Sequence, residues 1–180
     1  MMADAWRIEP LHRSHDKGHF DCGNPLLNEW LRKYAGQSQK AGIARTFVAL
    51  SGRDGGHSVQ GFYSMAAGGI DKTHLPAQAG RRFPKFPIPI IRLARLAVTK
   101  ESQGHGLGEF LLLDALHRSL QVSGQVGFVA VLVDAKDEAA RNFYLRYEFE
   151  TLPNQPLTLW LPLKAVGELF PADGETICTR

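Results

Sequence analysis

Three glycines at the start of a predicted helix are the residues of this chain with the clearest chemical use. Gln103-Gly-His-Gly-Leu-Gly108 follows a strand-like run that ends at Val98, and it leads into an apolar segment that begins at Leu107. Glycines leave consecutive backbone N–H groups bare, and the positive end of a helix dipole attracts anions. Each glycine costs a helix roughly 0.5–1 kcal/mol relative to alanine, so stability does not explain the three. The segment is therefore predicted to bind a pyrophosphate.

Two common phosphate-binding motifs do not fit this segment. A Walker loop needs Gly-x-x-x-x-Gly-Lys-Ser/Thr, and no Lys-Ser or Lys-Thr follows these glycines. A dinucleotide fingerprint needs Gly-x-Gly-x-x-Gly in the first strand-to-helix turn, whereas the spacing here is Gly104-x-Gly106-x-Gly108, past the middle of the chain. The pattern Gln103-x-x-Gly106-x-Gly108 instead resembles the pyrophosphate-binding signature of the GNAT superfamily of acetyl-CoA-dependent N-acetyltransferases.

That resemblance implies a fold and a set of cofactor-binding residues. The implied fold is α/β (α+β), with a mixed, mostly antiparallel twisted sheet flanked by helices and acetyl-CoA in a cleft between the central strands. No other cofactor is implied. The residues implied to bind acetyl-CoA are Leu96, Ala97, Val98, Gln103, Gly104, His105, Gly106, Leu107, Gly108, Glu109 and Phe143.

A second segment carries a candidate proton donor. Tyr144 lies on the apolar face of a helix expected over residues 136–147, and this spacing alone predicts a core residue. The pattern Phe143-Tyr144-x-x-x-x-Phe149, however, resembles the end of the GNAT core, in which the tyrosine reaches the thioester sulfur. The resemblance implies that Tyr144 is catalytic and that its phenol protonates the departing thiolate as a general acid.

A closer resemblance extends over roughly residues 11–163. It rests on Phe20-Asp-Cys-Gly23, Gly61-Phe-Tyr-Ser64 and the segment from Pro87 to Val98, together with the two segments above. These residues look like those of the GNAT toxins of type II toxin–antitoxin pairs. The resemblance implies that the protein acetylates the α-amino group of aminoacyl-tRNA, blocks translation and binds a ribbon-helix-helix antitoxin. Family members often form homodimers; the sequence leaves open the oligomeric state, the tRNA and the antitoxin.

Two other functions remain open from the sequence. One is a GNAT enzyme that acetylates a small amine or a protein amine, and the other is a non-catalytic module that binds acetyl-CoA. The pKa of an α-amino group is about 7.7–8.0, against about 10.4 for lysine, and an ester on the same carbon lowers it further. Such an acceptor needs no strong side-chain base, and residues 92–98 contain no carboxylate. This favours aminoacyl-tRNA as the substrate.

The distribution of charge is compatible with an RNA substrate. The formal net charge is +3. Clustered lysine and arginine are typical of phosphate recognition, although most charged residues form solvated faces. The residues predicted to contact tRNA phosphates are Arg92, Arg95, Lys33 and Arg82. For Arg92 and Arg95 taken singly, a surface salt bridge is an equally good interpretation.

The cysteines and histidines do not form a recognisable metal motif. His12, His15, His19 and Cys22 lack the spacing of a zinc site, so no metal is expected. Cys22 and Cys178 are far apart and imply no disulfide framework. A reducing compartment is therefore expected.

The remaining pattern predicts one domain without a membrane segment. Residues 1–163 are expected to form a single acetyltransferase domain, and residues 164–180 a tail of uncertain order. No apolar run approaches a membrane span, so a cytoplasmic location is expected. The expected elements are a helix from Asn24 to about Gly42, strands at 46–50, 59–66 and 90–98, a helix at 106–122, a strand at 127–134, a helix at 136–147 and a strand at 157–163. The first helix is expected to bury the stripe Leu27, Trp30, Leu31 and Tyr34.

Overall fold

The computed structural model describes residues 6–53 and 55–171, which fall into two compact units. Unit 1 lies within residues 1–66 and 94–115, and unit 2 within 67–93 and 116–180. Three elements run from one unit into the other: strands β3 (Val59–Ile70) and β4 (Ile88–Val98), and helix α4 (Leu107–Val122). The grouping of residues 1–163 into one functional domain stays a prediction.

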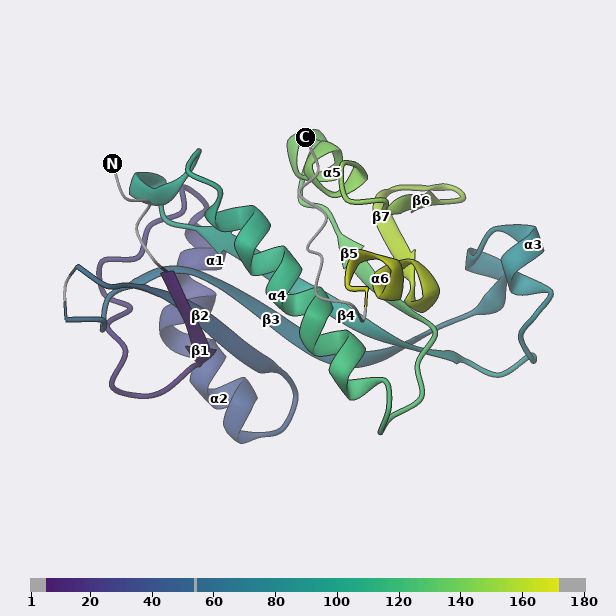
Figure 1. Ribbon diagram of the computed structural model, residues 1–180, viewed down its shortest axis with the longest axis horizontal. Coiled ribbons are helices and arrows are strands. Elements are labelled where there is room, and N and C mark those ends of the chain that lie inside the picture. The colour runs from purple at the N-terminus through teal and green to yellow at the C-terminus, as the bar shows by residue number, and fades with distance from the viewer. Residues whose placement is uncertain (1–5, 54, 172–180) are drawn as a thin grey trace. The chain divides into compact units, whose positions relative to one another are not determined.

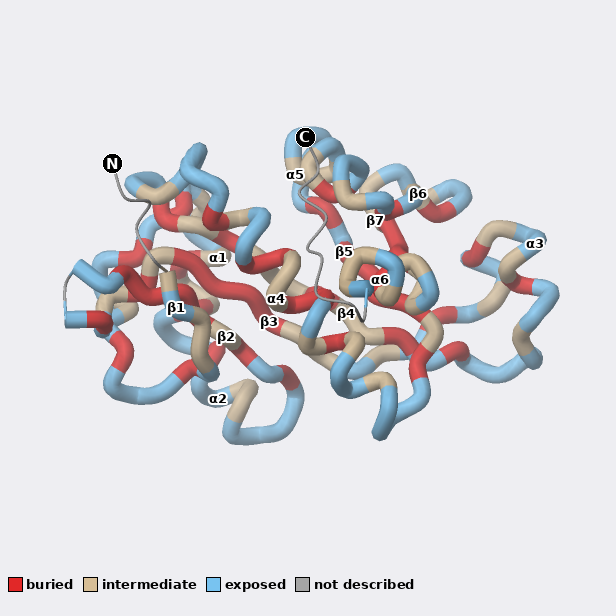
Figure 2. Tube along the Cα trace, viewed as in Figure 1, coloured by how far each residue is buried: buried red, intermediate tan, exposed pale blue. Residues whose placement is uncertain are grey.

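Unit 1 contains the N-terminal strands and helices (Figure 1). Its own elements are β1 (Trp6–Pro10), α1 (Pro25–Glu29), the π-helical turn η1 (Trp30–Tyr34), α2 (Ala35–Lys40), β2 (Arg45–Ser51) and the 3-10 turn η3 (Lys100–Ser102). Strands β1, β2 and β3 pair antiparallel, with Trp6 opposite Ser51 and Arg45 opposite Met65. The buried stretches of β2 and β3 are visible in Figure 2.

Successive residues of β3 pack against helices on opposite faces of the unit 1 strands. The Phe62 ring stacks on Trp30, which follows directly after α1, with ring centroids 5.8 Å apart. Gly61 instead meets α4, because a Cβ built there would lie 2.8 Å from Leu111 Cδ1. This is the alternation that a strand covered on both faces requires.

Helix α1 begins as its sequence predicts. The Asn24 side chain accepts hydrogen bonds from the N–H groups of Leu26 and Leu27, and Pro25 occupies the first turn. The chain stays helical through η1 and α2 and then turns at Gly42, whose φ of 74° favours glycine. This helix therefore starts and stops at the predicted residues.

Unit 2 contains the C-terminal half of the sheet. Its own elements are η2 (Lys72–His74), α3 (Ala77–Gly80), β5 (Ala130–Asp134), α5 (Glu138–Leu145), β6 (Glu150–Leu152), β7 (Gln155–Pro162) and α6 (Leu163–Leu169). Strand β4 pairs parallel with β5, with Arg92 opposite Leu132, whereas β5–β7 and β7–β6 are antiparallel. Ile88, Ile90, Leu132 and Trp160 belong to its core.

The strand order is β1-β2-β3-β4-β5-β7-β6. The predicted fold, a mixed and mostly antiparallel sheet with helices, is confirmed. Strands β1 and β6 and helix α6 were not predicted, and α6 occupies part of the segment expected to be a tail. Residues 172–180, including Cys178, lie outside the described residues. Among the helices that are described, none has the length and apolarity needed to cross a bilayer.

Candidate active site

The glycine turn in unit 1 is exposed and has open space around it. Gly104 and Gly106 have φ angles of 78° and 88°, and an added Cβ at either would meet no heavy atom within 4 Å. Helix α4 begins directly afterwards at Leu107, so the N–H groups of its first turn have no acceptor within the helix. Unpaired donors beside open space at a helix start fit an anion such as a pyrophosphate.

The start of α4 is fixed by close packing on β3. Leu107 and Leu111 are buried, at 1% and 0% exposure. A Cβ on Gly61 would come within 3.2 Å of both Leu107 Cδ2 and the carbonyl oxygen of Ala97. Glycine at position 61 therefore allows the helix to approach the strand closely, which holds the end of the glycine turn in place.

Gln103 supports the turn with its side chain. Its Nε2 donates to the carbonyl oxygens of Val98 (2.9 Å) and Cys22 (3.1 Å), and its own N–H donates to Lys100 O (3.3 Å). This residue of the motif is therefore engaged by the protein itself. Backbone donors from Gly104 onward are the ones left to a ligand.

The other residues predicted to bind acetyl-CoA differ in exposure. Of the strand residues that precede the turn, Ala97 is buried, whereas Leu96 and Val98 are half-buried. His105 and Glu109 are exposed. All of these belong to unit 1, as do the remaining turn residues, whereas Phe143, which is half-buried on α5 (Glu138–Leu145), belongs to unit 2.

Tyr144 lies in unit 2, on α5. It is buried, at 7% exposure, with ring centroids 5.2 Å from Phe143 and 5.6 Å from Phe149. Burial raises the pKa of the phenol, so the hydroxyl keeps its proton at neutral pH. Within the part of the chain that the structure describes, this hydroxyl has no hydrogen-bond partner. Tyr144 packs as a core residue, and its hydroxyl has no structural role among the described residues.

The four basic residues predicted to contact tRNA belong to different units. Arg92 and Arg82 are in unit 2, whereas Lys33 and Arg95 are in unit 1. Arg82 is exposed. Lys33 Nζ lies 2.8 Å from Glu29 Oε1, and this hydrogen bond raises the pKa of Lys33. Each unit therefore carries two of the four.

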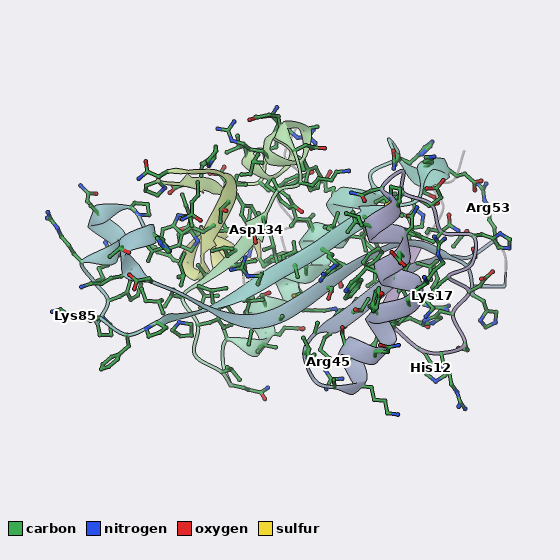
Figure 3. The ribbon with its side chains drawn as sticks, turned by 180° about the vertical axis from the view of Figure 1, so that it is seen from behind. His12, Lys17, Arg45, Arg53, Lys85 and Asp134 are labelled. Atoms are coloured by element: carbon green, nitrogen blue, oxygen red, sulfur yellow. The ribbon has the colours of Figure 1, made fainter. Side chains whose placement is uncertain are left out.

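Arg92 and Arg95 have contrasting surroundings although they are three residues apart. Arg92 pairs with Asp134, labelled in Figure 3, and the other oxygen of that carboxylate accepts from Thr158 Oγ1 at 3.0 Å. The Arg95 guanidinium instead lies over Trp30, 4.1 Å from the ring centroid, and burial lowers its pKa. Among the described residues no carboxylate pairs with Arg95. The salt-bridge interpretation fits Arg92, and an external anion is the better partner for Arg95.

His15, in the N-terminal segment, has a structural role. The buried His15 bonds Glu9 through Nε2 (2.7 Å), and its Nδ1 accepts from the N–H of His12 (3.0 Å). No group of three His, Cys, Asp or Glu side chains among the described residues is arranged to hold a metal ion.

Comparison with known proteins places this arrangement in a family. Residues 42–151 match the family model described as an acetyltransferase (GNAT) domain. The chain belongs to the GNAT acetyltransferase family. The family prediction is thereby confirmed, and so is the prediction that the protein is an N-acetyltransferase.

Relatives of this GNAT protein include toxins. It is 41% identical over 155 residues to the tRNA-acetylating toxin of Mycobacterium tuberculosis. This alignment covers 86% of this chain and 90% of that protein. It is 30% identical over 172 residues to the probable toxin TacT of Sinorhizobium fredii, covering 91% of this chain and 94% of that protein.

Two solved structures extend the comparison to three dimensions. A tyrosine-to-phenylalanine variant of KacT aligns with a TM-score of 0.87 and 30% identity, covering 92% of this chain and 99% of that one. AtaT complexed with acetyl-methionyl-tRNAfMet aligns with a TM-score of 0.85 and 27% identity, covering 93% and 100%.

Proposed function

We propose that this GNAT enzyme is a toxin that acetylates the α-amino group of aminoacyl-tRNA and so blocks translation. The observation that carries the proposal is the 41% identity, over 86% of the chain, to a protein named a tRNA-acetylating toxin. The complex of AtaT with acetyl-methionyl-tRNAfMet supports the same substrate class.

The cosubstrate that fits the glycine turn is acetyl-CoA, with which the neighbour AtaTR was solved. The backbone donors from Gly104 to Glu109 are assigned to its pyrophosphate, because open space and two left-handed glycines leave these donors accessible. Residues 96–98 and Phe143 are assigned to the rest of the cofactor by the family pattern. When bound, acetyl-CoA supplies the thioester whose acetyl group is transferred.

Tyr144 is assigned the proton transfer. The hydroxyl of this buried tyrosine stays protonated at neutral pH and supplies the proton that the departing thiolate sulfur takes up. The acceptor amine needs little help, since esterification of the amino acid's carboxyl group lowers the pKa of its α-amino group below about 7.7, so that a substantial fraction is neutral near neutral pH. Water suffices to remove the proton that the amine nitrogen loses when it forms the amide.

The partners of this protein are inferred from complexes of the same relatives. AtaT was solved with the C-terminus of the antitoxin AtaR, and KacTA was solved with DNA. These complexes support an antitoxin as the protein partner of this chain. The family resemblance assigns the antitoxin to the ribbon-helix-helix class, and a homodimer is the form to test by light scattering.

Transfer of label from acetyl-CoA to a charged tRNA pool tests the activity. We expect label on the amino acid of aminoacyl-tRNA and none on a pool that was deacylated beforehand. Label on free amines or on proteins, with none on charged tRNA, would replace the proposal by the small-amine or protein-amine alternative.

Expression of the protein should also arrest growth, and the product of a neighbouring gene should relieve the arrest.

Arg95, which no carboxylate of the described residues pairs with, gives a prediction about RNA binding. If its guanidinium contacts a phosphate, Arg95→Ala should weaken binding to all charged tRNAs alike and lower the salt slope of log K by about one. Lys164→Ala, on the exposed side of α6, removes the same charge and should leave the slope unchanged. Equal slopes for wild type and Arg95→Ala in a salt titration would reduce Arg95 to a packing residue on Trp30.

A further inference from the structure

The residues that precede the glycine turn are tied to a second turn, near the N-terminus, by the carboxylate of Asp21. This carboxylate accepts from Gly23 N (2.9 Å), Asn28 Nδ2 (2.9 Å) and Lys100 Nζ (3.0 Å). The backbone carbonyl of Asp21 also accepts, from Lys100 N at 2.8 Å and from Thr99 Oγ1 at 3.2 Å. One residue therefore organises its own turn and holds the residues that follow β4.

Cys22 and Asn28 extend this network to the glycine motif itself. The carbonyl oxygen of Cys22 accepts from Gln103 Nε2 at 3.1 Å, and the N–H of Cys22 donates to Asn28 Oδ1 at 2.9 Å. Asn28 is buried, at 7% exposure, and both ends of its amide are used. Residues 21–28 thus form a bracket on residues 99–103, and we call these bonds the Asp21 bracket.

The glycine turn needs such a support because it has no packing of its own. The residues from Gln103 to Gly106 are all exposed, and the space around Gly104 and Gly106 is open. Fixing the backbone of one residue costs roughly 1–2 kcal/mol, and glycine loses more freedom than any other residue. A turn that is held before the ligand arrives avoids this cost on binding. Leu107 and Leu111 fix its far end against Gly61, which leaves the near end to the bracket.

We propose that Asp21 is a positioning residue of the acetyl-CoA site: through the bracket, it holds the Gln103–Gly106 turn in the conformation that presents the N–H groups from Gly104 onward to the pyrophosphate. This inference rests on the proposed function, which assigns the pyrophosphate to that turn. It also gives a role to Phe20-Asp-Cys-Gly23, which neither the glycine motif nor Tyr144 explains.

The partners of the carboxylate differ in importance. The pKa of Asp21 is lowered to about 2, first by the N–H of Gly23, then by Asn28 and then by Lys100. The side chains of Lys100 and Asp21 are 62% and 52% exposed, and ion pairs at such exposure contribute little. The hydrogen bonds to Gly23 and Asn28 should therefore matter more than the charge of Lys100.

Calorimetric titration with acetyl-CoA separates these contributions. Loss of hydrogen bonds to a carboxylate should make Asp21→Ala bind acetyl-CoA about tenfold more weakly. Asp21→Asn retains an acceptor oxygen for Gly23 and Asn28, so it should recover most of the affinity, and Lys100→Met should stay within about twofold of wild type. The turnover number of Asp21→Ala at saturating acetyl-CoA should stay near the wild-type value, because the bracket positions the cofactor and touches no reacting atom.

Amide hydrogen exchange of the ligand-free protein provides a readout that needs no acetyl-CoA. Peptides that cover residues 99–109 should exchange faster in Asp21→Ala than in wild type, while peptides from α6 should not change. Asp71→Ala is the matched control, since Asp71 likewise accepts from a backbone N–H two residues ahead, that of Thr73, at 2.8 Å. It should change neither the affinity nor the exchange of residues 99–109.

Wild-type affinity and wild-type exchange in Asp21→Ala would overturn the proposal. If that variant does not fold, hydrogen exchange of Gln103→Leu decides, because this change removes the side-chain bonds to Cys22 O and Val98 O from the other side and should make residues 99–109 of the ligand-free protein exchange faster. Failure of wild type to bind acetyl-CoA would instead contradict the proposed function, and the exchange of the ligand-free turn would still test the bracket.

Discussion

Replacing Tyr144 by phenylalanine should lower the turnover number by about 10²–10⁴, the usual effect of losing a positioned general acid. The ring and its contacts with Phe143 and Phe149 are kept, and the lost hydroxyl has no hydrogen-bond partner among the described residues. The melting temperature and the affinity for both substrates should therefore change little. A transition-state interaction is lost, so the effect should appear in kcat with KM nearly intact.

Steady-state kinetics with charged tRNA measures this, and Tyr147→Phe is the control. Tyr147 follows α5 and packs on the same Phe143 ring, with centroids 5.2 Å apart, and it has no assigned role in the chemistry. Its variant keeps the ring that packs on Phe143 and should turn over within about twofold of wild type. If a folded Tyr144→Phe enzyme keeps the wild-type kcat, Tyr144 is the core residue that its helical spacing indicates.

Elements with a strong local signal were predictable from the sequence. The cap at Asn24 and the proline that follows act within the first turn of α1, so four residues are enough to locate the helix start. The glycine turn is equally local: left-handed φ angles at Gly104 and Gly106 are what glycines before a helix indicate. Strand β5 appeared as a continuous apolar run because it is buried in the sheet.

Elements stabilised by distant residues were not predictable in this way. Strand β1 has five residues and a mixed burial pattern, and it forms by pairing with β2, some forty residues later along the chain. The π-helical turn η1 changes the spacing of the first helix, which leaves Tyr34 47% exposed although its stripe predicted burial. Such pairings and turns depend on the assembled unit.

The site shows the same division between local and long-range information. The sequence treats Arg92 and Arg95 alike, because their partners Asp134 and Trp30 lie far from them along the chain. The bond from Gln103 to Cys22 is equally distant, so the motif indicated a ligand-binding turn but not the bracket that supports it. Chemistry could be predicted from the motif, whereas the environment of each side chain required the fold.

Placing an aspartate at Gly106 should weaken acetyl-CoA binding by at least about a hundredfold, because a buried or ligand-facing uncompensated charge costs several kcal/mol and about 1.4 kcal/mol is a factor of ten. Nothing lies within 4 Å of a Cβ at this position, so the new side chain has room in the ligand-free protein. The loss should therefore arise from the ligand, since a carboxylate would stand in the site that we assign to a pyrophosphate.

Two controls separate charge from backbone strain. Gly106→Asn adds nearly the same bulk without charge, and asparagine tolerates positive φ better than most residues. Gly42→Asp introduces the same charge at another exposed glycine of positive φ, 74° against 88°, and also with nothing within 4 Å of its Cβ. We expect calorimetry to rank acetyl-CoA affinity as wild type and Gly42→Asp together, Gly106→Asn weaker, and Gly106→Asp weakest. If Gly106→Asn and Gly106→Asp bind acetyl-CoA equally weakly, the size of the added side chain, and not its charge, causes the loss. Wild-type affinity in both variants would place the pyrophosphate elsewhere.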